Sequence, residues 1–419
     1  MKQTFIATYF VALALAGCKD NSPTDHSADP ITLFGKVVDV DNQPIAGATV
    51  VVKGKAAVTT NSTGLFTIAD VTTPYDISMI ARPQYGAIIY EGLKRYDPTL
   101  IFFIGTFGTL TSFATISGTA SINSGKAIRI FFVSGEQLWW TQPNHLDGTY
   151  SLFVTLQSPT ASLSGTLYLL RFTPGLSAPP TDYDGFASRQ VTVNAVGQYV
   201  NNFAPEELTD PIDETIGGTV TLPMNYLSRA RGLYIEFGKA RMHIANDNYA
   251  PFNNDFTYVV PRIPGTTLGI LAPAGPSGDG SSTYYKSRIA SGTTGVMISI
   301  QDAPDLIFPI NLEPNVDTLT SFLYSQPNGP VVSLLYILSE SPYNPQFYIF
   351  TDKGTTSIPK LSAQGLGLPL NRRFDWQVRQ FYPMASVDVA ASVEFFDLIN
   401  GRSGDYGQGV SEFSSFISR

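Results

Sequence analysis

The sequence predicts an all-β chain of tandem antiparallel β-sandwiches, and three observations predict it. Strand-favouring residues are abundant, with 21 tyrosines, 27 phenylalanines and many valines and threonines. Glycine (36) and proline (29) are frequent enough to punctuate many turns. The chain of 419 residues is too long for one hydrophobic core, and it contains an internal repeat of about 100 residues, the size of one sandwich domain.

Composition and charge narrow the range of partners. Charged residues make up only 14% of the chain, and the formal net charge of −8 is spread out without a basic block. This distribution is typical of ordinary solubility, so nucleic acid is not an expected partner. The single cysteine excludes an internal disulfide, and no Cys or His spacing is typical of a zinc site.

Residues 1–17 have the parts of a secretory signal peptide. Lys2 supplies the positive charge, an apolar segment runs from Phe5 to Ala16, and small residues follow. The segment is too short for a transmembrane helix, and no later apolar run in the sequence is long enough to cross a bilayer.

The end of this segment, Leu15-Ala16-Gly17-Cys18, resembles the lipobox of bacterial lipoproteins. That resemblance implies that the Cys18 thiol receives a diacylglyceryl group, that cleavage occurs before Cys18, and that the new α-amine is acylated. Two or more acyl chains anchor a protein stably, whereas one binds a membrane only marginally. Cys18 is therefore the expected lipidation site and the first residue of the mature chain.

Residues 18–31 are polar at first and predict a flexible tether. Lys19 follows the cysteine, so the aspartate that disfavours outer-membrane sorting in enteric bacteria is absent there. Lys19-Asp20 is similar to the short Lys/acidic signal of surface-exposed Bacteroidota lipoproteins. We expect a lipid anchor in the bacterial outer membrane, with the choice of leaflet left open.

Residues 32–105 resemble the carboxypeptidase regulatory-like domain, which is a transthyretin-like seven-stranded β-sandwich. The positions that match its pattern are Gly35, Val37, Asp39, Pro44, Ile45, Gly47, Ala48, Val50, Thr60, Gly64 and Phe66. The resemblance implies an accessory module that carries no catalytic groups, of a kind that recurs in bacterial surface proteins.

The internal repeat predicts the domain organisation of the middle of the chain. Residues 115–119 read TISGT and residues 215–219 read TIGGT, an offset of 100, and Gly-Thr recurs at 165–166 and 265–266 with the same offset. Two further sandwiches are therefore expected, repeat 1 at residues 112–207 and repeat 2 at residues 213–313.

Residues 314–419 form the last expected sandwich. The run Phe374-Asp375-Trp376-Gln377-Val378 resembles a late strand of the fibronectin type III fold, with Trp376 as a core residue, although immunoglobulin-like domains share this aromatic alternation. Residues 385–404 could include one short helix that ends near Gly401, and residues 410–419 predict a final edge strand.

Motifs for catalysis are not recognisable in the sequence. The histidines are His26 in the tether and His145 and His243 in turn-like contexts, where a surface or half-buried role is expected. None of them belongs to a zincin or metallocarboxypeptidase signature, and no nucleophile elbow, P-loop or dinucleotide fingerprint occurs. We therefore expect no enzyme activity, no catalytic residue, no metal and no cofactor.

Carboxylates gather at residues 205–214, PEELTDPIDE, between the two repeats. We interpret this proline-rich stretch as a solvated linker, with a glycosidase pair or a calcium site as alternatives. Two interpretations also apply to Asp39 and Asp41 and to residues 246–255. Their carboxylates either stabilise turns or bind calcium.

Aromatic pairs are the best candidates for ligand binding. Trp139 and Trp140 are adjacent in a predicted strand and must point to opposite faces, so only one of them can be core. The other is a candidate sugar-stacking platform, with packing between domains as the alternative. Tyr284 and Tyr285 form a second candidate pair.

The sequence favours a non-catalytic, lipid-anchored cell-envelope protein that serves adhesion, scaffolding or assembly. The alternative is a carbohydrate-binding lipoprotein that captures glycans at the cell surface, and a hydrolase with an unrecognised site is a third interpretation. The expected partners are the membrane, through Cys18, and a polysaccharide or other envelope proteins.

Overall fold

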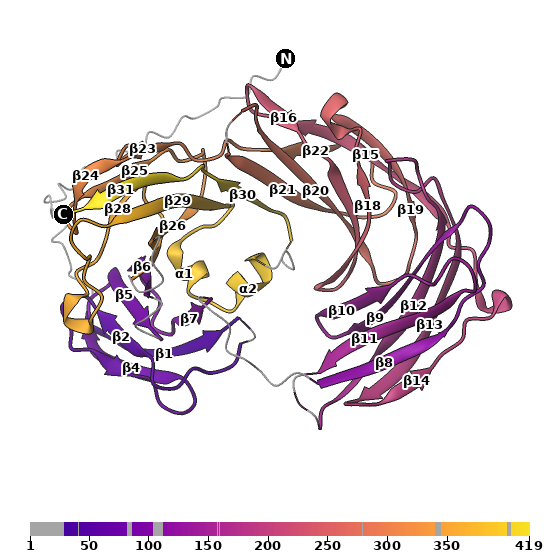
Figure 1. Cartoon of the computed structure of the whole chain (residues 1–419), viewed down its shortest axis with the longest axis horizontal. Helices are drawn as coiled ribbons and strands as arrows, with labels where there is room; N and C mark the ends of the chain where they lie inside the picture. The colour runs from indigo at the N-terminus through magenta and orange to yellow at the C-terminus, as the bar shows by residue number, and fades with distance from the viewer. Residues whose placement is uncertain are drawn as a thin grey trace, which may run out of the picture.

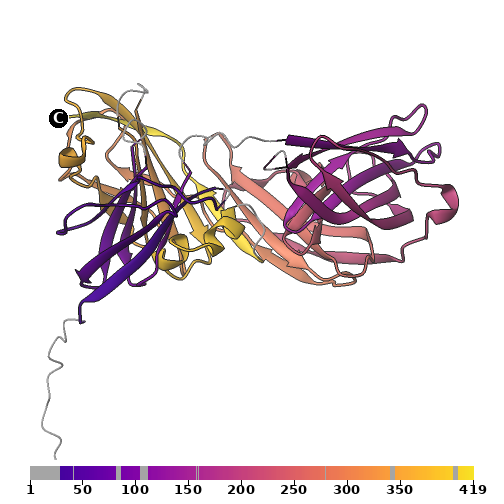
Figure 2. The ribbon, with the colours of Figure 1, turned by 90° about the horizontal axis from the view of Figure 1, so that it is seen from below.

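In the computed structural model, the regular structure of the described residues is almost entirely β, which confirms the predicted class of tandem sandwiches. Figure 1 shows four sandwiches around an open ring, and Figure 2 shows that they form two lobes. The predicted signal peptide (1–17), most of the tether and Cys18 lie outside the described residues. These are 29–40, 42–81, 86–103, 112–156, 158, 160–278, 280–339, 345–399 and 404–419.

The N-terminal sandwich has seven strands in the described residues. They are β1 (Ile31–Asp39), β2 (Thr49–Val52), β3 (Val58–Thr59), β4 (Leu65–Val71), β5 (Tyr75–Ile80), β6 (Ala87–Leu93) and β7 (Thr99–Phe102). β1 lies between antiparallel β4 and parallel β7, and the facing sheet has the order β6-β5-β2-β3. The sequence motif has structural reasons here. A Cβ at Gly35 would collide with the ring of Phe66, and Thr60 Oγ1 donates to the carbonyl of Ile45 (2.7 Å) while it accepts from the amide of Ala48 (2.9 Å).

Repeats 1 and 2 share one topology. The strands of repeat 1 are β8 (Ser112–Thr119), β9 (Ala127–Ser134), β10 (Gln137–Thr141), β11 (Thr149–Leu156), β12 (Ser162–Thr173), β13 (Asp182–Asn194) and β14 (Gln198–Val200). Those of repeat 2 are β15 (Asp213–Thr221), β16 (Tyr226–Ser228), β17 (Arg231–Phe237), β18 (Ala240–Asp247), β19 (Asp255–Pro261), β20 (Thr267–Pro276), β21 (Ser282–Ile289) and β22 (Val296–Ser299). Repeat 1 ends with the 3-10 turn η2 (Pro205–Glu207), and repeat 2 contains η3 (Ala250–Phe252). The sheets β11-β8-β14 and β19-β15-β22 correspond, as do β10-β9-β12-β13 and β18-β17-β20-β21.

The repeated Gly-Thr motif has a structural cause. A Cβ at Gly118 would collide with the carbonyl of Asn201, and one at Gly218 would collide with the carbonyl of Val296. Both glycines therefore sit where the first strand of a repeat meets the segment that pairs with it in parallel. Close backbone approach, rather than turn formation, explains why glycine stands at both positions.

The C-terminal sandwich contains β23 (Leu306–Phe308), β24 (Glu313–Val316), β25 (Ser321–Tyr324), β26 (Val332–Ser339), β27 (Phe347–Thr351), β28 (Thr355–Ser357), β29 (Arg373–Tyr382), β30 (Tyr406–Val410) and β31 (Ser414–Ser418), with η4 (Ser362–Gln364). Trp376 is fully buried, so its predicted place in the core is confirmed. Residues 385–404 include a short helix near Gly401 as expected, α2 (Glu394–Ile399), but the described residues also form a second one that was not expected, α1 (Val387–Ala390). The edge prediction for the last strand is wrong: β31 lies between β24 and β29, and its Phe416 is buried.

One continuous sheet runs through three of the sandwiches. The pairing of β21 with β30 joins repeat 2 to the C-terminal sandwich, and the parallel pairing of β27 with β6 joins the latter to the N-terminal sandwich. The resulting sheet has 15 strands among the described residues. Because these junctions are backbone ladders, neighbouring domains share hydrogen bonds as if they were one domain.

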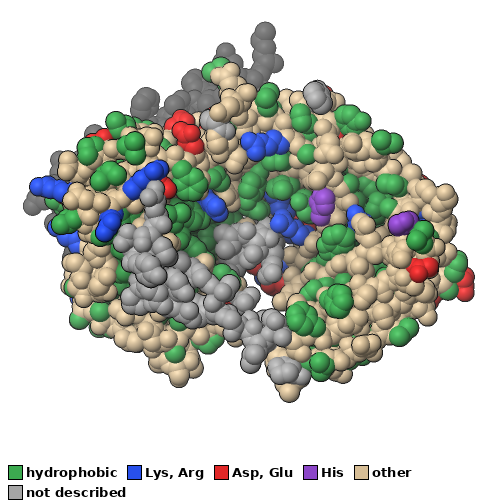
Figure 3. Space-filling model, in the orientation of Figure 1, with side chains coloured by type: hydrophobic (Ala, Val, Ile, Leu, Met, Phe, Trp, Pro, Cys, Tyr) green, Lys and Arg blue, Asp and Glu red, His purple; other side chains and the backbone are tan. Residues whose placement is uncertain are grey.

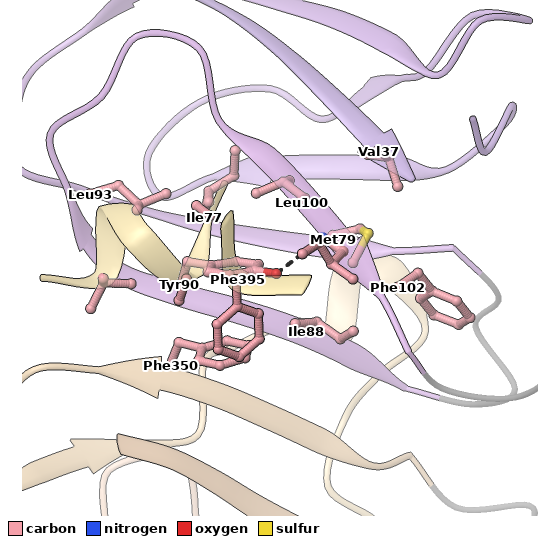
Figure 4. Close-up of a cluster of buried hydrophobic side chains, with 14 of the residues drawn as sticks. Val37, Ile77, Met79, Ile88, Tyr90, Leu93, Leu100, Phe102, Phe350 and Phe395 are labelled. Atoms are coloured by element: carbon pink, nitrogen blue, oxygen red, sulfur yellow. Dashed lines mark hydrogen bonds between the residues drawn. The ribbon is translucent and has the colours of Figure 1, made fainter. Parts of the chain in front are cut away.

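Apolar packing reinforces both lobes. At the junction of the N- and C-terminal sandwiches, Tyr90 stacks on Phe350 with ring centroids 4.9 Å apart, and Phe395 of α2 meets Phe350 edge-on at 5.2 Å (Figure 4). In the other lobe, Phe237 of repeat 2 lies 5.2 Å from Phe131 and 4.8 Å from Tyr168 of repeat 1. Each lobe therefore shares a hydrophobic cluster across its domain boundary.

Lys239 links the two lobes electrostatically. Its Nζ lies 2.7 Å from Glu136 Oε1 on the β9–β10 turn and 2.8 Å from Asp397 Oδ2 on α2. Hydrogen bonds to Asp397 and Glu136 raise the pKa of Lys239. One ammonium group thus touches repeat 1 and the C-terminal sandwich from a turn of repeat 2.

A buried ion cluster lies on the face of repeat 2 opposite its apolar core. Glu236 Oε1 lies 2.5 Å from Lys286 Nζ, and Glu236 Oε2 lies 2.5 Å from Arg288 Nε. Lys286 is fully buried, and burial lowers its pKa although the bond to Glu236 opposes that effect. The carboxylate therefore compensates an ammonium that water cannot reach.

We predict that Glu236→Gln destabilises the protein by about 3–5 kcal/mol at neutral pH, because it leaves Lys286 charged, buried and without its carboxylate. Since the folded state holds the Lys286 proton less tightly than the unfolded chain does, this loss should shrink as pH rises toward the ordinary lysine pKa. Urea unfolding between pH 7 and 10 measures it. The exposed Glu412→Gln is the control, with an expected change within about 0.5 kcal/mol. A pH-independent loss would contradict the assigned cause.

Candidate ligand-binding site between the two repeats

A cavity of about 500 Å³ lies between repeats 1 and 2, and we call it the inter-repeat pocket. Repeat 1 lines it from the start of β9, the β10–β11 connection and the end of β12, and repeat 2 lines it from β18. Its volume is within the range of pockets that hold small molecules or a few sugar units. Figure 3 shows this face, with the two histidine side chains in purple.

Arg129 is the central polar residue of the pocket. Its guanidinium carbon lies 5.0 Å from the ring centroid of Trp140 and 5.9 Å from that of Phe172. With its amide oxygen turned toward the guanidinium, Gln142 accepts hydrogen bonds from both terminal nitrogens of Arg129. Arg129 Nε is buried and, within the described part of the chain, has no hydrogen-bond partner.

The ionisable side chains that line the pocket are basic. Lys126, Arg129, His145 and His243 all line it, whereas its lining includes no Asp or Glu. Lys126 is paired, with Asp182 at 2.7 Å and Asp184 at 3.0 Å. Among the described residues no carboxylate lies within ion-pair distance of Arg129, and burial lowers its pKa, although an arginine remains protonated at neutral pH.

The two histidines are exposed at the edges of the pocket, one from each repeat. His243 Nε2 lies 3.0 Å from Asn246 Oδ1, and its ring lies 5.1 Å from that of Tyr234. His145 stands in the connection between β10 and β11. The sequence predicted turn-like contexts for both, which is wrong for His243 because it lies within β18. Nothing in the sequence indicated that the two would share a cavity.

Trp139 and Trp140 point to opposite faces of β10, as predicted. Trp139 packs against the core of repeat 1, with its ring 5.9 Å from that of Phe132 and its Nε1 donating to Thr155 Oγ1 (2.8 Å). Trp140 is 52% exposed and lies beside Arg129. Of the two candidate platforms, Trp140 is therefore the one that presents a ring to solvent, and it does so beside Arg129, a lining residue of the pocket.

Tyr284 and Tyr285 lie elsewhere, at the junction of repeat 2 with the C-terminal sandwich. Tyr284 donates to Gln408 Oε1 (2.8 Å) and meets Tyr406 edge-on at 5.8 Å, while Tyr285 stacks on Tyr382 at 6.4 Å. Burial raises the pKa of both phenols. Their contacts are those of interdomain packing, and they do not line the inter-repeat pocket.

Three of the candidate carboxylates, Glu207, Asp247 and Asp39, have structural partners. Glu207 accepts from the amide of Ala204 (2.8 Å) and pairs with Arg189, and Asp247 accepts from Arg231 (2.9 Å) and from a tyrosine hydroxyl. Asp39 accepts from the amide of Gln43, and Asp41 lies outside the described residues. In the part of the chain that the structure describes, no three His, Cys, Asp or Glu side chains are grouped to hold a metal.

Sequence reasoning missed Arg129. The strand pattern IRIFFV alternates, with Ile128 and Ile130 facing the core of repeat 1, so Arg129 had to lie on the other face. A cation within an otherwise apolar strand is the signal that could have identified it. What the pattern does not contain is the second repeat, which covers that face and turns it into a pocket.

The two tryptophans give a test of this division of roles. We expect Trp139→Ala to destabilise repeat 1 by about 3 kcal/mol, because it removes a packed ring and the bond to Thr155. Trp140→Ala should change stability by less than about 1 kcal/mol because half of its ring is already in water. Thermal unfolding followed by circular dichroism compares them, and equal losses would contradict the assignment.

Among the residues that the structure describes, no helix is long and apolar enough to span a membrane.

No family model and no curated protein matches the chain. One weakly similar solved structure is the Bacillus anthracis TIE protein, with 11% identity over 65% of this chain and 50% of that one and a TM-score of 0.16. Another is the shaft pilin SpaA from Lactobacillus rhamnosus GG, with 9% identity over 45% of this chain and 97% of that one and a TM-score of 0.15. A third is BcpA, the major pilin subunit of Bacillus cereus, with 7% identity over 64% of this chain and 98% of that one and a TM-score of 0.14. The match covers half the length of the Bacillus anthracis TIE protein chain. Similarity at such TM-scores supports no inference about function.

Proposed function

We propose that this chain is a non-catalytic, lipid-anchored cell-envelope protein that serves as a rigid platform for adhesion, scaffolding or assembly. The observation that carries the proposal is the 15-stranded sheet, which joins three sandwiches through backbone hydrogen bonds and so presents their surfaces in a fixed arrangement. A fixed arrangement suits a protein that positions partners, since flexible linkers would lose that geometry.

The lipobox-like end at Cys18 supports the anchoring part of the proposal. The first described strand begins at Ile31, so the polar residues between Cys18 and Ile31 would separate the sandwich from the bilayer. That spacer would leave the surfaces of all four sandwiches free of the membrane. The bacterial outer membrane is the proposed site of attachment.

Cys18→Ala tests the anchor. In bacterial cells that process lipoproteins, the wild-type chain should incorporate radioactive palmitate and fractionate with the outer membrane. The variant should remain uncleaved by the lipoprotein signal peptidase and carry no label. Palmitate labelling of the variant would refute lipidation at this residue, whereas loss of label with unchanged membrane fractionation would point to a different mode of attachment.

A second candidate function is glycan capture, and one observation favours it: the half-exposed ring of Trp140 lies beside Arg129, which lines the inter-repeat pocket. Sugar rings present C–H faces that pack on indole, and the polar groups of the pocket could orient hydroxyls. Gln142 and Asn246 supply neutral amides for such contacts.

Affinity-gel electrophoresis of the mature chain against a broad polysaccharide panel separates the two candidates. Glycan capture predicts retardation on at least one polysaccharide, reduced roughly tenfold or more in Trp140→Ala because about 1.4 kcal/mol of packing is lost. Tyr249→Ala, which removes a half-exposed aromatic ring of repeat 2 that does not line the pocket, is the control and should bind normally. Absence of retardation across the panel would reject glycan capture and leave the platform function.

A further inference from the structure

We infer that the inter-repeat pocket binds a carboxylated saccharide, with the carboxylate on Arg129 and the sugar ring against Trp140. The inference rests on the glycan-capture candidate and adds the charge of the ligand, which the sequence did not indicate. Its starting point is the contrast between a chain of net charge −8 and a pocket whose ionisable lining residues are all bases.

The inference depends on Arg129, because among the described lysines and arginines that line the pocket it is the one with no carboxylate within ion-pair distance. Lys126 is held by two aspartates, and two other arginines of repeat 1 are paired as well: Arg171 lies 2.9 Å from Asp184, and Arg189 lies 2.8 Å from Glu207. Arg129 has instead a neutral amide and two aromatic rings. Arg129 is half-buried, so its cation has lost part of its hydration without gaining an anion, and a ligand that brings a carboxylate supplies that compensation on binding.

The donor geometry also suits a carboxylate. A guanidinium has five N–H groups, and Gln142 accepts one from each terminal nitrogen. Gln142 occupies the two N–H groups that converge between the terminal nitrogens, so each terminal nitrogen retains one outward N–H, and the Trp140 and Phe172 rings and the Gln142 amide hold the guanidinium in place. A carboxylate can accept a charge-assisted hydrogen bond from an outward N–H of this planar, preorganised cation, which a mobile ammonium does not offer in a fixed direction.

Trp140 supplies the reason for a saccharide rather than a free anion. Its ring is next to the guanidinium, and 52% of the side chain is open to solvent. In a uronic acid the carboxylate and the apolar face of the ring belong to the same residue, so the two groups can be engaged together. The volume of about 500 Å³ leaves room for neighbouring sugar units, whose hydroxyls would meet Asn246 and the two histidines.

The test uses a matched ligand pair on the mature chain: oligogalacturonate and its methyl ester, which keeps the sugar and removes the charge. Isothermal titration calorimetry should show the acid binding at least roughly tenfold more tightly than the ester, because a charge-assisted hydrogen bond is lost in the ester. The preference should weaken as salt increases. Alginate and hyaluronan fragments, which are also uronic acids, extend the series.

Arg129→Gln should abolish the preference for acid over ester, and Arg129→Lys should retain part of it, because the charge stays while the planar fork is lost. Arg189→Gln is the matched control: that arginine also lies over an aromatic ring of repeat 1, 4.2 Å from the centroid of Phe203, but outside the pocket, so its acid preference should be unchanged. Circular dichroism melts of each variant establish that it is folded.

The possible outcomes distinguish this inference from the glycan-capture function on which it rests. Equal binding of acid and ester, lost in Trp140→Ala, would overturn the inference while supporting glycan capture. Acid preference that survives Arg129→Gln would overturn the assignment to Arg129. No binding of any saccharide would reject both. Binding of inorganic phosphate with the same affinity as the uronic acids would also overturn it, since the sugar would then contribute nothing.

Discussion

Backbone pairing between strands of different sandwiches is the interaction on which the rest of this structure depends. A sandwich leaves open sheet edges, whose unpaired N–H and C=O groups must find partners. Here β6 pairs with β27 and β21 pairs with β30, so two junctions between domains are made by the edges themselves. The clusters around Phe350 and Phe237 then bury apolar surface across boundaries whose geometry the ladders and contacts define.

The candidate site is a by-product of the same packing. Repeat 1 presents the outer face of its larger sheet to repeat 2, and Phe131 and Tyr168 on that face contact Phe237. Arg129 lies on the same face beyond the apolar contact, where the two repeats diverge and leave the pocket. Hydrophobic contact thus holds the repeats together, and the polar remainder of the interface is available for a ligand.

Local patterns in the sequence predicted the local structure well. The 100-residue offset identified two sandwiches of the same topology, the alternation around Trp376 identified a core strand, and the adjacency of Trp139 and Trp140 required opposite faces. Features that depend on distant partners could not be predicted. The partner of β31 is β24, about a hundred residues earlier, so its edge position was misjudged. The importance of Arg129 depends on the repeat that covers it, and no periodicity encodes that contact.

The pairing of Ala87 with Phe347 has a consequence for the order of folding. These residues are 260 positions apart in the sequence. The N-terminal sandwich is therefore synthesised first, and β6 gains its pairing partner only when the last quarter of the chain has been made. Such a non-local contact closes a long loop, which slows folding and prolongs the time during which β6 can pair wrongly. A chain of this design therefore has reason to rely on chaperones until its final strands have been made, and truncation near the C-terminus should harm the first domain as much as the last.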